Sequence, residues 1–367
     1  MAGNKTISVL FLTRYPVEGA SSRYRVFQYV PYLEKMGIAC TVQSFMDADM
    51  YRLSLSSGGT MKKIGVTLRA MLQRLGMLAR FRQFDVIYMQ RELFPFGPPL
   101  VERFLKRMGV PLVFDFDDAL FIKKPSRYNP IATFFRSPGK TLDMFRLVDR
   151  TVAGNDWLRE NAEREGAKAI TVEVAEDTRR FVSAEEKLAN RPDCVTIGWL
   201  GSPSTVKYMA EIEDQLREVA AHHPDARWEM MGSGEFAMEG VPWVTEDWSI
   251  EDEKAALARY DIGLMPLPKQ EWSRGKSGGK ARTYMAAAVV PVVAAIGYNS
   301  ELIREGETGF LCDVEADWVT ALDRLIGDAD LRRKVAIAAQ SDVEARFSPK
   351  QKAAEIAAVL HELASAG

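Results

Sequence analysis

The alternation of short apolar runs with longer amphipathic stretches constrains the fold of this chain more than any other feature of its sequence. The runs are rich in Val and Ile and are too short to be helices. Between them lie stretches such as 23–36, in which Val26, Val30 and Leu33 recur at helical spacing on one side. This alternation is typical of α/β proteins, in which helices connect the strands of a parallel sheet.

The runs fall into two series, separated by a polar stretch at 176–193 that carries charges of both signs and is interpreted as a linker. The predicted strands are 7–12, 40–45, 85–89, 111–115, 150–153 and 170–174 in the first series, and 195–200, 228–231, 261–266 and 290–295 in the second. The sequence therefore predicts two Rossmann-like domains facing across a cleft, and an Ala-rich helix at 350–363. We place the boundaries at 1–178 for the N-terminal domain, 179–193 for the linker, 194–347 for the C-terminal domain and 348–367 for a final helix returning to the first domain.

Composition excludes several classes of protein. The chain has 48 Lys and Arg against 50 Asp and Glu, so its net charge of −2 argues against nucleic-acid binding. Its three cysteines lie far apart and it has three histidines, so we expect no disulfide framework, no CxxC metal cluster and no multi-histidine metal site. No uncharged apolar run reaches the roughly 20 residues of a membrane helix. A cytoplasmic protein that meets membranes only from the surface fits these observations.

The loop at 270–280, QEWSRGKSGGK, is the strongest candidate for a binding site. Glycines let backbone N–H groups approach an anion, and a helix follows whose N-terminus adds positive potential. We expect Ser277, Gly278 and Gly279 to cradle a diphosphate, with the charges supplied by Arg274, Lys276 and Lys280. A flexible, solvated loop is the alternative. The loop is not a Walker A motif, because position 270 is Gln where that spacing requires Gly.

A second loop follows the predicted strand 195–200. Gly201, Ser202 and Thr205 precede a helix that carries Lys207, an arrangement suited to a phosphate. The same groups are equally suited to capping the helix.

Three carboxylates, Asp115, Asp117 and Asp118, follow the apolar run at 111–115. Such a cluster is suited to a divalent ion, to acid–base chemistry or to sugar hydroxyls, and it also resembles the motif of haloacid-dehalogenase phosphatases. That motif normally follows the first strand and continues with Thr or Val, whereas Ala119 follows here. A turn with a helix cap is the remaining alternative.

The loop after the first strand combines small residues with two arginines. Gly19 permits close approach of a ligand, and Arg23 or Arg25 suits an anionic acceptor. Helix capping by Ser21 or Ser22 is the alternative.

The segment from Met50 to Phe84 holds seven Lys or Arg and no Asp or Glu. Leu and Met residues alternate with these charges between Lys62 and Arg82. This pattern indicates either a basic amphipathic helix on an anionic membrane surface or an ordinary core-facing helix with a basic outer face.

The second half of the chain resembles the donor-binding domain of GT-B glycosyltransferases of family 4 over residues 195–347. The motifs that carry the resemblance are DIGLMPL at 261–267, GKSGGKARTYMAAAVVPVVAA at 275–295, and the segments 297–301 and 307–311. The resemblance implies transfer of a sugar from a nucleotide diphosphate donor, with retention of configuration and without an essential metal. It also implies that the donor lies mainly on the C-terminal domain, the acceptor mainly on the N-terminal domain, and that the final helix crosses back.

The resemblance assigns residues to this donor site. It places 276–280 on the diphosphate, Lys207 and the 201–205 loop near the phosphates, and Glu301 on the donor side. The family's two glutamates, eight positions apart, would fall at Gly275 and Thr283, so neither is present. The family's N-domain catalytic histidine is also missing, since the first histidine is His222. By position, Asp117 or Asp118 would take its place.

We therefore expect a cytoplasmic glycosyltransferase of the hexosyltransferase type (EC 2.4). Its partners would be a nucleotide-sugar donor and a lipid-linked or glycan acceptor of cell-envelope or surface polysaccharide biosynthesis, with no separate cofactor. Lys280 would neutralise the departing diphosphate together with its neighbours. Contact with anionic lipid would bring the protein to the inner face of the cytoplasmic membrane. Two alternatives remain open: a GT-B-like protein that binds a nucleotide sugar or glycan without turnover, and an Asp-dependent phosphatase.

Overall fold

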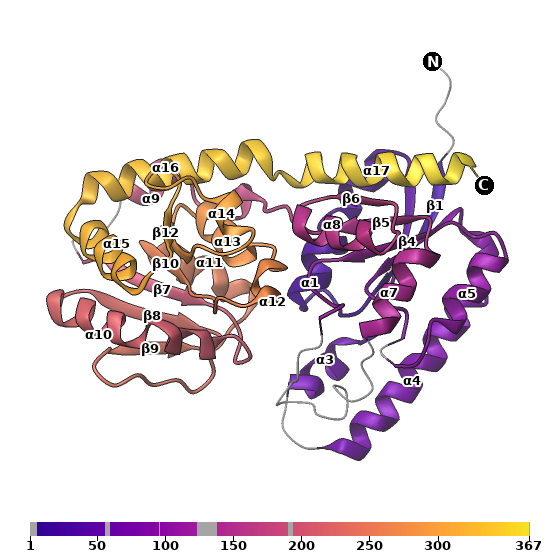
Figure 1. The fold of residues 1–367 in the computed structure, drawn as a ribbon, viewed down its shortest axis with the longest axis horizontal. Coiled ribbons are helices and arrows are strands. Elements are labelled where there is room, and N and C mark those ends of the chain that lie inside the picture. Colours follow the sequence, from indigo (N-terminus) through magenta and orange to yellow (C-terminus); the bar gives the residue numbers. More distant parts are fainter. Residues whose placement is uncertain (1–5, 56–58, 95, 123–137, 190–193, 367) are drawn as a thin grey trace. The chain divides into compact units, whose positions relative to one another are not determined.

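The computed structural model describes residues 6–55, 59–94, 96–122, 138–189 and 194–366. The chain divides into two compact units: unit 1 comprises 1–175 together with 349–367, and unit 2 comprises 176–348. Each unit is built on a parallel sheet of six strands with helices packed against it (Figure 1). The predicted α/β class with two Rossmann-like domains is confirmed.

The sheet of unit 1 has the strand order β2-β1-β3-β4-β5-β6. Its strands are β1 (Ile7–Thr13), β2 (Ile38–Ser44), β3 (Val86–Gln90), β4 (Leu112–Phe116), β5 (Arg150–Ala153) and β6 (Ala169–Thr171). Every residue of β3 and β4 is buried, as expected for central strands that helices cover on both faces. All six strands are parallel, so their carboxyl ends form one edge of the sheet.

The helices of unit 1 are α1 (Ala20–Ser22), α2 (Val30–Lys35), α3 (Ala48–Leu55), α4 (Thr60–Leu78), α5 (Leu100–Arg107), α7 (Pro138–Leu147), α8 (Asp156–Arg164) and α17 (Pro349–Ala366). The stretch 23–36, predicted as one helix, is interrupted. Arg23–Phe27 forms a π-helical turn, and α2 then starts again with Pro31 in its first turn. Proline lacks the N–H that would continue the helix, so the interruption falls where its sequence requires it.

The final helix, α17, belongs to unit 1 although the whole of unit 2 precedes it in the chain. It packs on α2, β1 and β3, and its buried residues, including Ile356 and Leu360, join the core formed by Val9 and Tyr29 (Figure 1). The returning helix that the resemblance implied is therefore present.

The sheet of unit 2 has the order β12-β11-β10-β7-β8-β9, again with parallel neighbours. Its strands are β7 (Thr196–Leu200), β8 (Arg227–Met231), β9 (Trp243–Glu246), β10 (Ile262–Met265), β11 (Val290–Ala294) and β12 (Phe310–Cys312). Its helices are α9 (Ala184–Ala189), α10 (Glu213–His222), α11 (Ile250–Arg259), α12 (Glu271–Arg274), α13 (Gly279–Ala286), α14 (Asn299–Leu302), α15 (Glu315–Gly327) and α16 (Ala329–Arg346).

The described part of the predicted linker is folded into unit 2. Lys187 on α9 is buried, and its ammonium donates to the carbonyl oxygens of Leu257, Ala287 and Ala288 at 2.9, 2.9 and 3.1 Å. This lysine of the predicted linker thus serves internal contacts that the sequence does not display.

None of the helices in the described ranges combines the length and the apolar character needed to span a bilayer.

Candidate active site

The candidate site in unit 2 is built at the carboxyl edge of its sheet, where ligands bind in open parallel sheets. Two of the loops singled out from the sequence meet there. Lys280 in the first turn of α13 donates to Thr205 Oγ1 in the loop after β7, over 3.4 Å. The same ammonium lies 4.4 Å from the ring centroid of Trp199, a fully buried residue of β7.

The glycines of the 270–280 loop shape the start of α13. Gly278 is the N-cap residue and has a left-handed φ of 65°, which favours glycine. A Cβ atom added at Gly279 would meet nothing within 4 Å, so the space beside the first residue of the helix is open. Open space at a glycine-bounded helix N-terminus is what close approach of an anion requires.

Aromatic rings bring further cations of the site together. The Lys276 ammonium lies 4.1 Å from the centroid of the Trp272 ring, which packs against Tyr208 at 6.3 Å. The exposed Lys207 lies over the other ring of this pair, Tyr208, at 5.5 Å. Lys207, Lys276 and Lys280 thus belong to one aromatic-lined region of unit 2.

The charge of Lys280 is poorly compensated within the described residues. Burial and, secondly, the charge of Lys276 lower the pKa of Lys280 from 10.5 to about 7. Among the described residues, Lys280 has no carboxylate partner; its contacts are Thr205 and the Trp199 ring. A cation that is costly to hold without an anion is the electrostatic signature of an anion-binding site.

The remaining predicted donor residues lie around this loop. Gly201 and Ser202 are half-buried in the loop after β7, and Ser277 accepts a hydrogen bond from the buried Arg282 through its carbonyl. Glu301 is exposed in the first turn of α14, after β11.

Arg274, also predicted to contact the donor, ends α12 and is exposed. It lines a pocket of about 490 Å³ together with Lys269, Glu271, Ile296 and Asp313. Lys269 and Asp313 form an ion pair of 2.8 Å in this pocket. Arg274 thus faces a polar hollow beside the glycine loop.

Thr283 differs from its expected role. It is 5% exposed, and its hydroxyl donates to Glu176 over 2.7 Å. Glu176 in turn accepts from Arg180 at 2.9 Å. The Thr283 hydroxyl is therefore engaged by a neighbouring carboxylate within unit 2.

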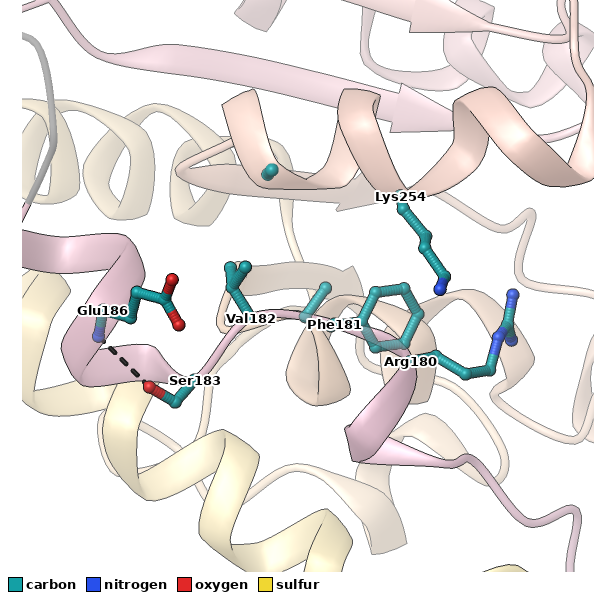
Figure 2. A pocket seen from close by; sticks show the side chains of 8 residues that line it. Arg180, Phe181, Val182, Ser183, Glu186 and Lys254 are labelled. Carbon is teal, nitrogen blue, oxygen red and sulfur yellow. Dashed lines mark hydrogen bonds between the residues drawn. The ribbon is translucent and has the colours of Figure 1, made fainter.

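A second pocket of unit 2 lies away from this loop. It has a volume of about 320 Å³ between the segment 180–186 and α11, and Figure 2 shows Phe181, Val182 and Lys254 along it. None of the residues predicted to bind donor or acceptor or to act in catalysis lines it.

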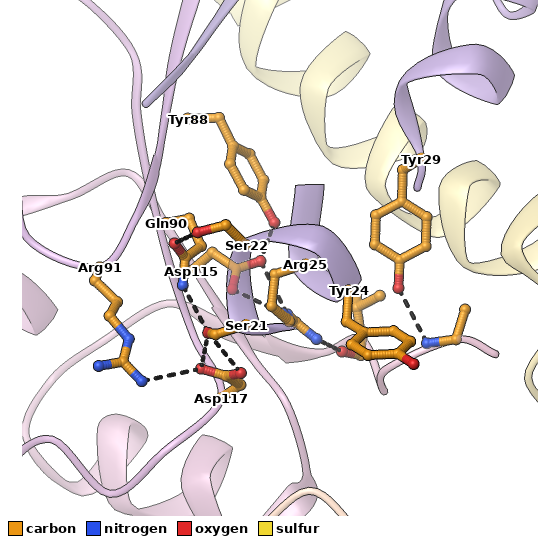
Figure 3. A network of polar contacts seen from close by, with 12 residues as sticks. Ser21, Ser22, Tyr24, Arg25, Tyr29, Tyr88, Gln90, Arg91, Asp115 and Asp117 are labelled. Atoms are coloured by element: carbon orange, nitrogen blue, oxygen red, sulfur yellow. Dashed lines mark hydrogen bonds and ion pairs between the residues drawn. The ribbon is translucent and has the colours of Figure 1, made fainter. Parts of the chain in front are cut away.

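The candidate site in unit 1 lies at the carboxyl ends of β3 and β4 (Figure 3). Both Asp117 carboxylate oxygens accept from the Ser21 hydroxyl at 2.8 and 2.9 Å. Arg91, directly after β3, lies 3.6 Å from the Asp117 carboxylate and 3.0 Å from that of Asp118. The predicted carboxylates Asp117 and Asp118, in the loop after β4, thus lie beside the loop after β1 that carries Gly19 and Arg23.

The structure contradicts the roles predicted for Asp115 and Arg25. Both side chains are fully buried, and they form a two-pronged ion pair of 2.8 and 2.9 Å. Arg25 also donates to the carbonyl of Val172, and the Tyr88 hydroxyl donates to Asp115. Arg25 therefore has no surface for an acceptor, and Asp115 has none for a phosphatase reaction.

Gly19 and Arg23 have local partners. A Cβ at Gly19 would lie 2.3 Å from that of Tyr15, so packing on Tyr15 explains the glycine without a ligand. Arg23 donates to the carbonyls of Val17 and Glu18 and lies over the ring of Tyr24.

Sequence reasoning missed Arg91 and Gln90. Gln90 is the last residue of β3 and is 1% exposed; its amide donates to Ser21, and its carbonyl oxygen accepts from Ser22 at 2.9 Å. A glutamine at the end of an otherwise apolar strand was the available signal. Arg91 offered no such signal, because the sequence does not reveal its left-handed backbone conformation.

Two parallel-sheet units, one with a cationic glycine loop at its carboxyl edge, are the arrangement found in the GT-B fold. Residues 191–328 match the family model of glycosyl transferases group 1. The resemblance found from the sequence is thereby confirmed over this segment, and the chain has the GT-B fold.

Solved structures share the fold over nearly the whole chain. HepE of Anabaena, crystallised with UDP-glucose, matches with a TM-score of 0.68 at 15% identity, covering 97% of this chain and 100% of its own. Sucrose-phosphate synthase of Thermosynechococcus elongatus matches with a TM-score of 0.70 at 11% identity, covering 98% and 100%. Trehalose 6-phosphate synthase of Burkholderia multivorans matches with a TM-score of 0.64 at 13% identity, covering 98% and 99%. No curated protein matches the chain significantly.

Proposed function

We propose that this protein transfers a hexose from a nucleoside diphosphate sugar to a lipid-linked or glycan acceptor in the synthesis of a cell-envelope or surface polysaccharide. The observation that carries the proposal is Lys280, a poorly compensated cation at the N-terminus of α13 beside an open glycine backbone. The UDP-glucose in the HepE complex supports a uridine diphosphate donor.

Loss of the diphosphate is the step that this loop assists. Negative charge grows on the leaving oxygens, and Lys280, Lys276 and the backbone N–H groups at Gly278 and Gly279 oppose it. We propose that the transfer retains configuration, as the family resemblance implies. We also propose that it needs no metal, since lysines at this loop supply the positive charge that a divalent ion supplies elsewhere. In unit 1, Asp117 and Asp118 orient or deprotonate the acceptor hydroxyl.

The surface of α4 supports an acceptor in a membrane. Met61, Ile64, Leu68, Leu72 and Leu75 recur at helical spacing on one side of this helix and are 43–81% exposed. Lys62 and Arg69 are exposed beside this apolar stripe. An apolar stripe flanked by cations suits the headgroup region of an anionic bilayer, and we propose reversible attachment to the inner face of the cytoplasmic membrane.

One alternative keeps support from a specific observation. Positions 275 and 283 are Gly and Thr, so both carboxylates that the resemblance would place in this segment are missing from it. A protein that binds a nucleotide sugar without turnover would tolerate this loss.

Release of labelled sugar separates the two functions. The protein is incubated with UDP-, GDP- and ADP-linked hexoses, with and without EDTA, and free or transferred sugar is quantified beside a Lys280→Ala control. We expect turnover of at least one donor, unaffected by EDTA and reduced in the control. Tight donor binding with no turnover of any donor would favour the binding protein, and loss of turnover in EDTA would contradict metal independence.

A further inference from the structure

Arg91 holds a backbone conformation that is costly for a residue with a side chain. Its φ is 67°, and the described residues include one other non-glycine residue with positive φ, Ala288. The left-handed region is disfavoured by contacts of Cβ with the backbone, and such strain persists where the surrounding structure enforces it. Here the Arg91 N–H donates to the carbonyl of Asp115 over 2.8 Å, which ties the strained residue to the end of β4.

The strained backbone directs the guanidinium toward two carboxylates. Nη2 of Arg91 lies 3.0 Å from Asp118 and 3.6 Å from Asp117, and the three side chains are 13, 29 and 12% exposed, respectively. Figure 3 shows Arg91 and Ser21 approaching the Asp117 carboxylate from different directions. Asp117 is therefore held from two directions.

In the hydrogen bonds that link Gln90, Ser21 and Asp117, the donor and the acceptor of each bond are fixed. The Gln90 amide donates to Ser21 at 3.0 Å, so the Ser21 hydroxyl is left to donate to Asp117. The Gln90 carbonyl oxygen accepts from Ser22 and from the backbone N–H of Arg14 at 3.1 Å, which fixes the amide orientation. This series of hydrogen bonds fixes the position of Asp117 but supplies no positive charge. Among the contacts of the described residues, the ion pair with Arg91 supplies that charge.

The arginine is not optimised for stability. Its Nε is buried and has no hydrogen-bond partner among the described residues, and its backbone is strained. Arg23, Arg150 and Arg282 also have a buried Nε without a hydrogen-bond partner among the described residues, so the strained backbone is the feature that sets Arg91 apart. The strain is explained if the location of the guanidinium beside Asp117 matters for the reaction.

We propose that Arg91 is a positioning residue that orients Asp117 toward the acceptor hydroxyl or, without acceptor, toward the attacking water. This inference rests on the proposed function. It predicts that removing the guanidinium costs turnover and not folding or donor binding, because the proposed diphosphate site lies on unit 2 while Arg91 lies on unit 1.

The decisive variant is Arg91→Gly, since glycine adopts the observed φ without strain. We expect a thermal midpoint close to that of wild type, because relief of the strained backbone offsets the loss of the ion pairs with Asp117 and Asp118. We also expect a UDP Kd within twofold of wild type, and a kcat lowered about ten- to a hundredfold on the donor turned over fastest, with its KM within twofold. Arg91→Lys keeps the charge and should recover part of the lost kcat. Ala288→Gly relieves the same kind of strain in unit 2 and should leave kcat unchanged.

The outcomes separate the two claims. An Arg91→Gly variant with wild-type kcat overturns the positioning role alone, as does a variant whose kcat loss follows a lowered thermal midpoint. A wild-type protein that turns over no nucleotide sugar overturns the proposed function and this inference with it.

Discussion

At the scale of single residues, Lys280 connects the fold to the proposed chemistry. Burial and Lys276 lower its pKa to about 7, so above that pH the free protein holds it largely neutral. A bound diphosphate favours the charged form and so raises the pKa again. Binding must then take up a proton at mildly alkaline pH, and affinity must fall as the pH rises.

Proton uptake can be measured directly. Calorimetric titration with UDP at pH 8, in two buffers of different ionisation enthalpy, should show uptake approaching one proton per UDP bound. The UDP affinity should decrease between pH 7 and pH 9. Lys280→Met should show no uptake and a flat pH dependence. Wild-type binding that is independent of the buffer would contradict the assignment.

The Arg25–Asp115 pair gives a second prediction at this scale. Both groups are fully buried, so Arg25→Met leaves a buried carboxylate without its partner. Such a loss costs about 3–5 kcal/mol of unfolding free energy. The matched control is Arg52→Met, whose partner Asp49 is 93% exposed and whose loss should cost less than about 1 kcal/mol. Urea denaturation measures both, and equal small losses would contradict the structural role of the pair.

At the scale of elements, the apolar runs predicted ten of the twelve strands named in the structure, with bounds shifted by a few residues at most. The two missed strands, β9 and β12, lie at the edges of the unit 2 sheet. β9 is mostly exposed and β12 has three residues, so neither needs the continuous apolar run that marks a central strand.

The candidate sites were predictable to the level of loops but not of side-chain directions. The glycines and lysines at 275–280 are typical of a loop that precedes a helix at the carboxyl edge of a parallel sheet. The inward turn of Arg25 depends on Asp115, ninety residues further on, and the pair becomes visible only when β4 lies beside the first loop. The same holds for Arg74, a buried arginine of α4 that donates to the carbonyls of Thr13 and Leu93.

The α4 helix yields a prediction for membranes. Arg74 anchors the helix to unit 1, while Leu68 and Leu72 are 56 and 70% exposed and contribute little to the core. Replacing both by Ser should leave the thermal midpoint unchanged and reduce co-sedimentation with anionic liposomes several-fold. Lys62→Glu with Arg69→Glu should reduce it further at low salt, since each cation contributes about 1 kcal/mol near the surface.

Two controls complete the liposome experiment. Wild-type binding should rise with the fraction of anionic lipid and fall with salt. Equal binding to neutral vesicles, or binding that survives both double substitutions, would contradict a role for this face of α4.

At the scale of the whole molecule, the two units differ in how the chain forms them and in the role proposed for each. Unit 2 is one continuous segment that carries the proposed donor loop, whereas unit 1 is completed by α17 from the end of the chain. Ligand binding should therefore stabilise unit 2 first. UDP at 100 times its Kd adds about 2.7 kcal/mol to the state that binds it.

Leu360→Ala tests this division. Leu360 on α17 is fully buried in the core of unit 1, and its loss should cost about 2–5 kcal/mol there. Calorimetric scans should show a lowered transition that UDP does not restore and a second transition that UDP still raises. A variant in which UDP restores the lowered transition would contradict independent units.

The central claim is that the 274–280 loop holds the donor diphosphate, and calorimetry with UDP against uridine tests it most directly. Wild type is compared with the Ala variants of Arg274, Lys276 and Lys280. A charge-assisted hydrogen bond contributes roughly 1.5–3 kcal/mol, so Lys280→Ala should weaken UDP binding about ten- to a hundredfold and uridine binding far less. Wild-type UDP affinity in all three variants would contradict the account.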